Sequence, residues 1–202
     1  MTASHEYLGA LAARVTDDLV VIWGPKPANE WHELRPSDAN LYDVYMSGAA
    51  AFALGIALGL PHRRVICIDG DGSMLMDLPI LPVIAHQNPS NLVVLVFDNE
   101  AHEAAGRTPT FTAGKTDLVA MARGAGIDHA WMVSGLDEFD RALDQAFGAP
   151  GASFINLKVE MVDRRPPLRA GDGTENKYRF IRHIERTEGI RIIKPLGVSL
   201  PG

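Results

Sequence analysis

The chain has 202 residues, of which 47% are hydrophobic, so it is long enough for one well-buried core and its length favours a single domain. Its net charge of −6 disfavours a general attraction to nucleic acid or to anionic membranes. It has neither an apolar run of ~18 residues nor a secretory signal, so we expect an untargeted, soluble, cytoplasmic protein. The only cysteine, Cys67, lies in an apolar run, where we expect a buried packing residue rather than a reactive thiol.

Short apolar runs of strand length alternate with helix-like segments along the chain. The expected strands are 19–23, 64–69, 92–98, 129–133 and 153–159, and the expected helices are 47–60, 77–87, 117–124 and 135–147. Pro79 and Pro82 should make the second helix begin late or bend. This alternation predicts an α/β fold, a three-layer sandwich in which helices cover both faces of a mainly parallel sheet.

Two polar motifs follow neighbouring strands, at the carboxyl ends where such sheets bind ligands. GDGS follows the strand 64–69, and Asp98–Asn99 closes the strand 92–98. Glycines permit a tight turn and a close approach of the backbone to a ligand, while N–H groups and a hydroxyl suit phosphate oxygens. The motif is therefore expected to bind a phosphate through Gly70, Asp71, Gly72 and Ser73.

Asp71 and Asn99 supply hard oxygen ligands, and with a backbone carbonyl near Ala101 they predict a magnesium site that is completed by diphosphate and water. GDG also occurs in plain turns, and DN is common at strand ends. A second GDG, at Gly171–Gly173, follows no apolar strand and lies in a polar, proline-rich stretch. We interpret that second copy as a turn.

GDGS at 70–73, with Asn99 standing 28 positions after Asp71, resembles the diphosphate and magnesium motif of thiamine diphosphate enzymes. The resemblance covers about residues 40–160 and is similar to the pyrophosphate-binding domain of the decarboxylase group, above all sulfopyruvate and phosphonopyruvate decarboxylases. Segment 100–110 shares a Gly and a Pro-Thr pair with that group. Glu100 departs from it, because the family has a glycine at this position.

The resemblance also implies which residues meet the cofactor's aminopyrimidine. Met46 would be the apolar wedge that bends the cofactor, and the carbonyl of Val44 would accept a hydrogen bond from its exocyclic amine. Met46 could instead pack in the core ahead of an Ala-rich helix, because methionine fills irregular gaps readily.

Three further side chains after Asn99 are candidates for chemistry. His102 and Glu103 are the catalytic candidates, since a histidine titrates near neutrality and suits proton transfer. Arg107 is a candidate for pairing with a substrate carboxylate, sulfonate or phosphonate. All three could equally be ordinary surface residues.

Thiamine diphosphate chemistry needs a glutamate to activate the aminopyrimidine, and in the family this residue belongs to a separate pyrimidine-binding domain. Only one α/β domain fits in this chain, and neither Glu6 nor Glu33 stands in a matching context. The resemblance therefore implies half an active site and a separately encoded, pyrimidine-binding partner subunit. The alternative is a domain cut from a longer protein, against which Met1 and the C-terminus argue mildly.

We assign residues 1–165 to the cofactor-binding domain and 166–202 to a C-terminal extension. In the extension, Thr174 precedes an amphipathic helix pattern at 175–186 that would pack on its own domain or on the partner. Residues 191–201 are expected to be extended.

The leading hypothesis is the cofactor-binding subunit of a two-subunit, thiamine diphosphate- and Mg²⁺-dependent 2-oxoacid decarboxylase. Its substrate would resemble sulfopyruvate or phosphonopyruvate. Two alternatives remain: a carboligase subunit similar to acetolactate synthase, and a catalytically silent subunit that binds the cofactor.

Overall fold

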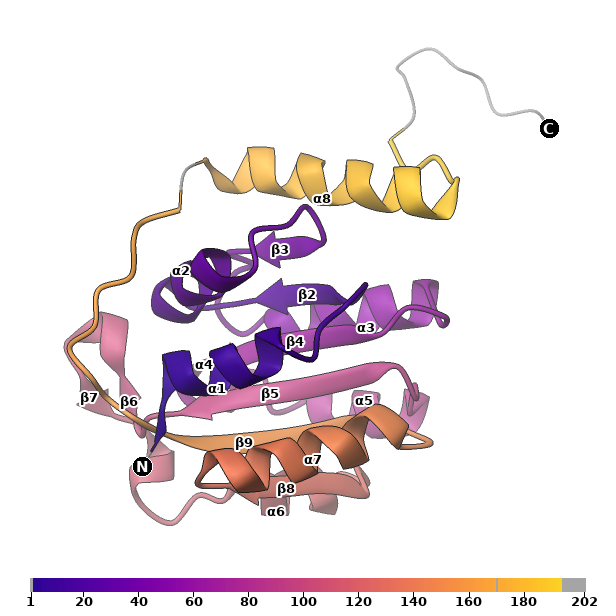
Figure 1. The fold of residues 1–202 in the computed structure, drawn as a ribbon. Helices are drawn as coiled ribbons and strands as arrows, with labels where there is room; N and C mark the ends of the chain where they lie inside the picture. Colours follow the sequence, from indigo (N-terminus) through magenta and orange to yellow (C-terminus); the bar gives the residue numbers. More distant parts are fainter. Residues whose placement is uncertain (1, 170, 194–202) are drawn as a thin grey trace.

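A computed structural model of the protein describes residues 2–169 and 171–193, and it has a seven-stranded parallel sheet at its centre (Figure 1). The strand order is β1-β9-β5-β4-β2-β3, and β8 also pairs with β9. The strands are β1 (Thr2–Ala3), β2 (Leu19–Ile22), β3 (Asn40–Tyr42), β4 (Val65–Gly70), β5 (Leu92–Asp98), β8 (His129–Val133) and β9 (Ser153–Glu160). A separate antiparallel pair joins β6 (Ala101–His102) to β7 (Thr108–Pro109).

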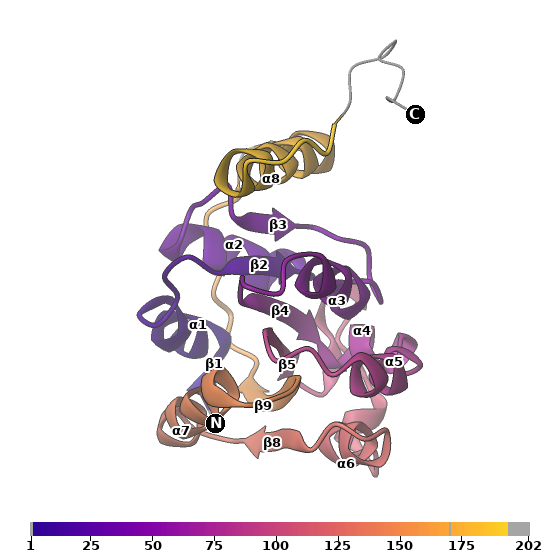
Figure 2. The same cartoon turned by 90° about the vertical axis from the view of Figure 1, so that its right-hand side faces the viewer.

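Helices cover both faces of this sheet, as Figure 2 shows from the side. One face carries α1 (Ser4–Ala12), α2 (Pro25–Leu34) and α7 (Leu136–Gly148), and the other carries α3 (Ala49–Gly59), α5 (Ile80–Gln87) and α6 (Leu118–Gly124). Along β4, Val65 and Cys67 join one core while Ile66 and Ile68 join the other, as expected of a parallel strand buried on both sides. The predicted three-layer α/β fold and the buried cysteine are confirmed.

Each predicted strand and helix is present, with ends shifted by a few residues. α5 begins at Ile80, directly after Pro79, so the late start is confirmed. The sequence did not reveal α1, α2 or β3. α2 is hidden because Pro25 and Pro27 lie in its first turn, where proline is tolerated, and β3 has only three residues. Within the described ranges, none of the helices is both long and apolar enough to cross a membrane.

The C-terminal extension returns to the domain through α8 (Gly173–Glu188), which lies along the edge strand β3 (Figures 1 and 2). The side chain of Asn176 accepts a hydrogen bond from the Tyr42 N–H at 2.7 Å and donates to the Asn40 carbonyl at 3.2 Å. Phe180 and Ile184 join the core beside α3. A buried amide side chain thus occupies backbone groups that an outer strand leaves unpaired.

The start of α8 corrects one sequence interpretation. Asp172 is the N-cap, whose carboxylate accepts from the Glu175 N–H at 2.8 Å, and the helix begins at Gly173 rather than after Thr174. The second GDG is therefore a helix-capping sequence, with Gly171 at a φ of +100°. Of the segment expected to be extended, 194–201 lies outside the described residues.

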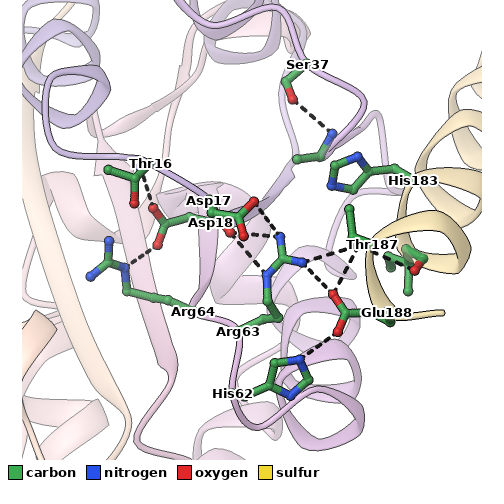
Figure 3. A network of polar contacts seen from close by, with 12 residues as sticks. Thr16, Asp17, Asp18, Ser37, His62, Arg63, Arg64, His183, Thr187 and Glu188 are labelled. Carbon is green, nitrogen blue, oxygen red and sulfur yellow. Dashed lines mark hydrogen bonds and ion pairs between the residues drawn. The ribbon is translucent and has the colours of Figure 1, made fainter. Parts of the chain in front are cut away.

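The end of α8 is held by a polar network at the amino ends of β2 and β4 (Figure 3). Arg63 is 7% exposed, and it donates to the carbonyl and carboxylate of Asp17, to the Thr187 hydroxyl and to the Glu188 carboxylate. His62 lies 2.6 Å from the second oxygen of Glu188. The network joins α8 to the amino ends of the strands, at the opposite end of the sheet from GDGS.

Candidate functional site

A cavity of about 420 Å³ lies at the carboxyl ends of β2, β4, β5 and β9. It is lined by the ends of these strands and the segments that follow them, by Ser4 at the start of α1, and by Met46, which precedes α3. The structure brings together most of the residues singled out in the sequence: Met46, Gly70, Asp71, Gly72, Ser73, Asn99, Ala101, His102 and Glu103. Eight of these nine residues lie at the end of β4 or in the segments that follow β4 and β5, and the ninth is Met46.

Asp71 is the first residue of the short helix α4 (Asp71–Met76) and is 2% exposed. Its Oδ2 accepts hydrogen bonds from the hydroxyls of Thr110 and Thr112, at 2.5 and 3.1 Å. Because the Thr112 hydroxyl has one proton, it shares its donation between Asp71 and Asp98, whose Oδ1 lies closer, at 2.7 Å. Sequence reasoning missed both threonines as site residues, although Thr110 belongs to the Pro-Thr pair that the sequence shares with the decarboxylase group.

The negative charge of Asp71 is poorly compensated. Burial raises the pKa of this carboxyl, and the nearby Asp98 carboxylate adds to the rise, while the Thr110 hydrogen bond opposes it. Burial likewise raises the pKa of Asp69 to about 6. Asp98 pairs with Lys158 at 2.9 Å, whereas the ion pairs found in the described part of the chain do not include Asp71. A buried carboxylate that lines a cavity without a cationic partner fits a divalent metal ion.

The glycines of GDGS fit a close approach of a ligand to the backbone. A Cβ on Gly70 would have only the Phe97 carbonyl within reach, at 4.0 Å, so its side of the cavity is open. A Cβ on Gly72 would lie 2.4 Å from Nδ1 of His102, so the imidazole packs directly on this glycine. His102 is half-buried in the cavity wall as a result.

Asn99 follows β5 and holds the next turn together. Its Oδ1 accepts from the Ala101 N–H at 3.1 Å, and its Nδ2 donates to Oε2 of Glu103 at 3.2 Å. Glu100, between Asn99 and Ala101, has a φ of +62°, which lies in the left-handed region that favours glycine. The departure from the family's glycine is thus accommodated with backbone strain, and the Glu100 carboxylate forms an ion pair with Lys158 at 2.7 Å.

The strain at Glu100 gives a testable difference between two substitutions. Glu100→Gly and Glu100→Ala both lose the ion pair, but only glycine relieves the left-handed backbone. We expect Glu100→Gly to have a free energy of unfolding about 1 kcal/mol higher than Glu100→Ala in urea titrations. At Glu138, inside α7, the order should reverse, because glycine is the poorer helix former. Equal stability of the two Glu100 variants would contradict the strained conformation.

Met46 is held in the cavity wall by its neighbour. The Ser47 N–H donates to the hydroxyl of Ser73 at 2.8 Å, which ties the segment before α3 to GDGS. Ser47 has a φ of +67°, so the chain turns sharply after Met46. Val44 is buried in the core beside α3, and its side chain is not part of the cavity lining.

The positively charged side chain that lines the cavity is Lys26 rather than Arg107, the residue singled out in the sequence. Arg107 is exposed in the turn between β6 and β7 and does not line the cavity. Lys26, in the first turn of α2, is the single lysine or arginine among the described residues that do so. Its Nζ lies 3.2 Å from Oε1 of Glu103 and 2.9 Å from the Val162 carbonyl. Lys26 could have been predicted from the sequence because it lies shortly after β2, whose carboxyl end is on the same side of the sheet as GDGS.

Comparison with known proteins agrees with this geometry. Residues 42–157 match the family described as thiamine pyrophosphate enzyme, C-terminal TPP binding domain. The chain is 32% identical over 168 residues to the sulfopyruvate decarboxylase subunit beta of Methanocaldococcus jannaschii, covering 80% of this chain and 85% of that protein. It is 35% identical over 150 residues to the phosphonopyruvate decarboxylase of Streptomyces viridochromogenes, covering 74% of this chain but 37% of that enzyme.

A solved structure shares the fold. The thiamine diphosphate-dependent 4-hydroxybenzoylformate decarboxylase of Rhodococcus jostii RHA1 superposes with a TM-score of 0.68 at 19% identity, covering 80% of this chain and 33% of that one. At this identity the likeness shows the fold alone. With more than half of its residues matched to the family, the chain belongs to the thiamine pyrophosphate enzymes and corresponds to their C-terminal cofactor-binding domain.

Proposed function

We propose that the chain is the cofactor-binding subunit of a two-subunit, thiamine diphosphate-dependent 2-oxoacid decarboxylase that acts on a sulfopyruvate- or phosphonopyruvate-like substrate. The observation that carries this proposal is the buried, uncompensated Asp71 in a cavity at the carboxyl ends of β4 and β5. Similarity over 85% of a decarboxylase beta subunit, against 37% of a longer phosphonopyruvate decarboxylase, supports an enzyme divided between two chains.

The lining residues suit the two ends of the cofactor. Asp71, the Asn99 Oδ1 and the Ala101 carbonyl would hold Mg²⁺, and Gly70, Gly72 and Ser73 would face the diphosphate. Met46 and the Val44 carbonyl would meet the aminopyrimidine. When bound, the cofactor supplies an electron sink for the carbon that loses carbon dioxide. His102, packed on Gly72, is the side chain of this chain best placed to hold or deliver a proton there.

The activating glutamate is proposed to come from a partner subunit. Glu6 lies in the first turn of α1, where its carboxylate accepts from the Ala3 N–H at 2.8 Å. Glu33 pairs with Arg164 at 2.6 Å. Neither residue lines the cavity. Both oxygens of Glu103, which does line it, are engaged by Lys26 and Asn99.

The test is to purify the chain with and without the product of a neighbouring reading frame, and to supply thiamine diphosphate, Mg²⁺ and sulfopyruvate, phosphonopyruvate or pyruvate. We expect release of carbon dioxide and an aldehyde from an anionic substrate only when both chains are present. A longer-chain product would support the carboligase alternative. Calorimetric binding without turnover by any combination would support the silent subunit, and absence of cofactor binding would overturn all three readings.

A further inference from the structure

We propose that Glu103 and Lys26 form a positioning pair that fixes the orientation of the Asn99 side chain, and thereby sets the magnesium affinity of the site. This inference rests on the proposed function, because it assumes that Asn99 is a metal ligand. It gives Glu103 a role that acts through Asn99 rather than on the substrate.

The side-chain amide of Asn99 has an oxygen and a nitrogen of nearly equal size, and only the oxygen can bind a metal ion. The contacts on its two sides decide which atom points where. Glu103 presents Oε2 at 3.2 Å, and an ionised carboxylate only accepts hydrogen bonds, so Nδ2 must face it. The Ala101 N–H, at 3.1 Å, only donates, so it must face Oδ1.

These two contacts specify the same orientation, and they leave a lone pair of Oδ1 for a metal ion. A flipped amide would place Oδ1 against the Glu103 carboxylate and Nδ2 against the Ala101 N–H. Both contacts would then be repulsive, and a nitrogen with two protons would replace the metal-binding oxygen. Loss of the Glu103 carboxylate therefore removes one of the two contacts that hold Asn99 in the metal-binding orientation.

Lys26 holds that carboxylate in place. Its Nζ lies 3.2 Å from Oε1, the oxygen that Asn99 does not use, and also donates a hydrogen bond to the Val162 carbonyl at 2.9 Å. Three segments that follow β2, β5 and β9 thus meet at one ammonium group. Because Lys26 acts on Asn99 only through Glu103, its loss should have the smaller effect of the two.

The experiment measures thiamine diphosphate binding by calorimetry at a series of Mg²⁺ concentrations, using the full chain in complex with its partner. Glu103→Ala should raise the Mg²⁺ concentration for half-maximal binding about 10- to 100-fold, as does the loss of other residues that hold a metal ligand in place. Glu103→Gln, which retains an acceptor oxygen, should recover part of this loss, and Lys26→Met should fall between wild type and Glu103→Ala. Glu33→Ala, which breaks an ion pair outside the cavity, should leave the Mg²⁺ dependence unchanged.

A second variant separates orientation from simple loss of charge. In an Asn99→Asp background either side-chain orientation offers an oxygen, so adding Glu103→Ala should weaken Mg²⁺ binding far less than it does beside asparagine. A loss of the same size in both backgrounds would show that Glu103 contributes charge alone and would overturn the inference.

Two other outcomes would separate a failure of the positioning role from a failure of the metal assignment. An unchanged Mg²⁺ dependence with equal loss of kcat in Glu103→Ala and Glu103→Gln would make Glu103 an acid–base group and overturn the positioning role. If the wild-type complex bound the cofactor without any Mg²⁺ dependence, the metal assignment in the proposed function would fail, and this inference would fail with it.

Discussion

Asp71→Asn is expected to weaken Mg²⁺-dependent binding of thiamine diphosphate by more than about 100-fold, because removal of a charged ligand should exceed the ~10- to 100-fold cost of losing a residue that only holds a ligand in place. The free energy of unfolding of the ligand-free chain should stay the same or rise. Burial and Asp98 raise the pKa of the Asp71 carboxyl, so a neutral amide of the same shape removes an unfavourable buried charge. Calorimetry and urea unfolding measure the two effects separately.

A matched control is available six positions further along. Asp77 is also a carboxyl whose pKa is raised by burial, but it does not line the cavity. Asp77→Asn should leave the affinity for the cofactor close to that of the wild type. If Asp71→Asn and Asn99→Ala both retained tight, Mg²⁺-dependent binding, the assignment of these residues as metal ligands would be wrong.

The second large effect is a loss of stability on substitution of Arg63, which lies at the amino ends of the strands, away from the cavity. Arg63→Ala should lower the free energy of unfolding by about 2 kcal/mol or more, because it removes a buried guanidinium whose hydrogen bonds reach the carboxylates of Asp17 and Glu188. His62 would remain as the ion-pair partner of the half-buried Glu188. Arg186→Ala, whose pair with Asp38 spans 3.9 Å between exposed side chains, should cost less than about 0.5 kcal/mol. Urea unfolding of both variants tests this contrast.

Cofactor affinity provides the control for Arg63→Ala, since the network in Figure 3 lies away from the cavity. Binding measured below the unfolding transition should match the wild type. A destabilisation of Arg63→Ala no larger than that of Arg186→Ala would mean that the network contributes little beyond a solvent-exposed ion pair.

The sequence predicted those parts of the fold in which local pattern and tertiary environment agree. β4 and β5 are continuous apolar runs because both faces of each strand are buried, and GDGS and Asp98–Asn99 mark where they end. Strand–helix alternation then places both motifs at one edge of the sheet. Elements without a strong pattern were missed: α2 begins with two prolines, and β3 is too short to show an alternation.

Within the site, residues next to a strand end were easier to predict than residues on a longer connection. The charge of Arg107 suggests a substrate contact, but the chain turns at Gly106 and Arg107, with φ values of +79° and +58°, and Arg107 is not among the residues lining the cavity. Thr110 and Thr112 reach the site only through the path of the segment that follows β6. Such paths depend on contacts between distant segments, which one sequence does not display.

The hydrogen bonds between Asn176 and the backbone of β3 affect how this chain can assemble with other proteins. An open edge strand invites another chain to add a strand by backbone pairing, a common mode of both recognition and aggregation. Here the Tyr42 N–H and the Asn40 carbonyl are already occupied by the extension. Growth of the sheet past β3 would require α8 to leave, so at this edge strand the extension restricts assembly to surfaces formed by side chains.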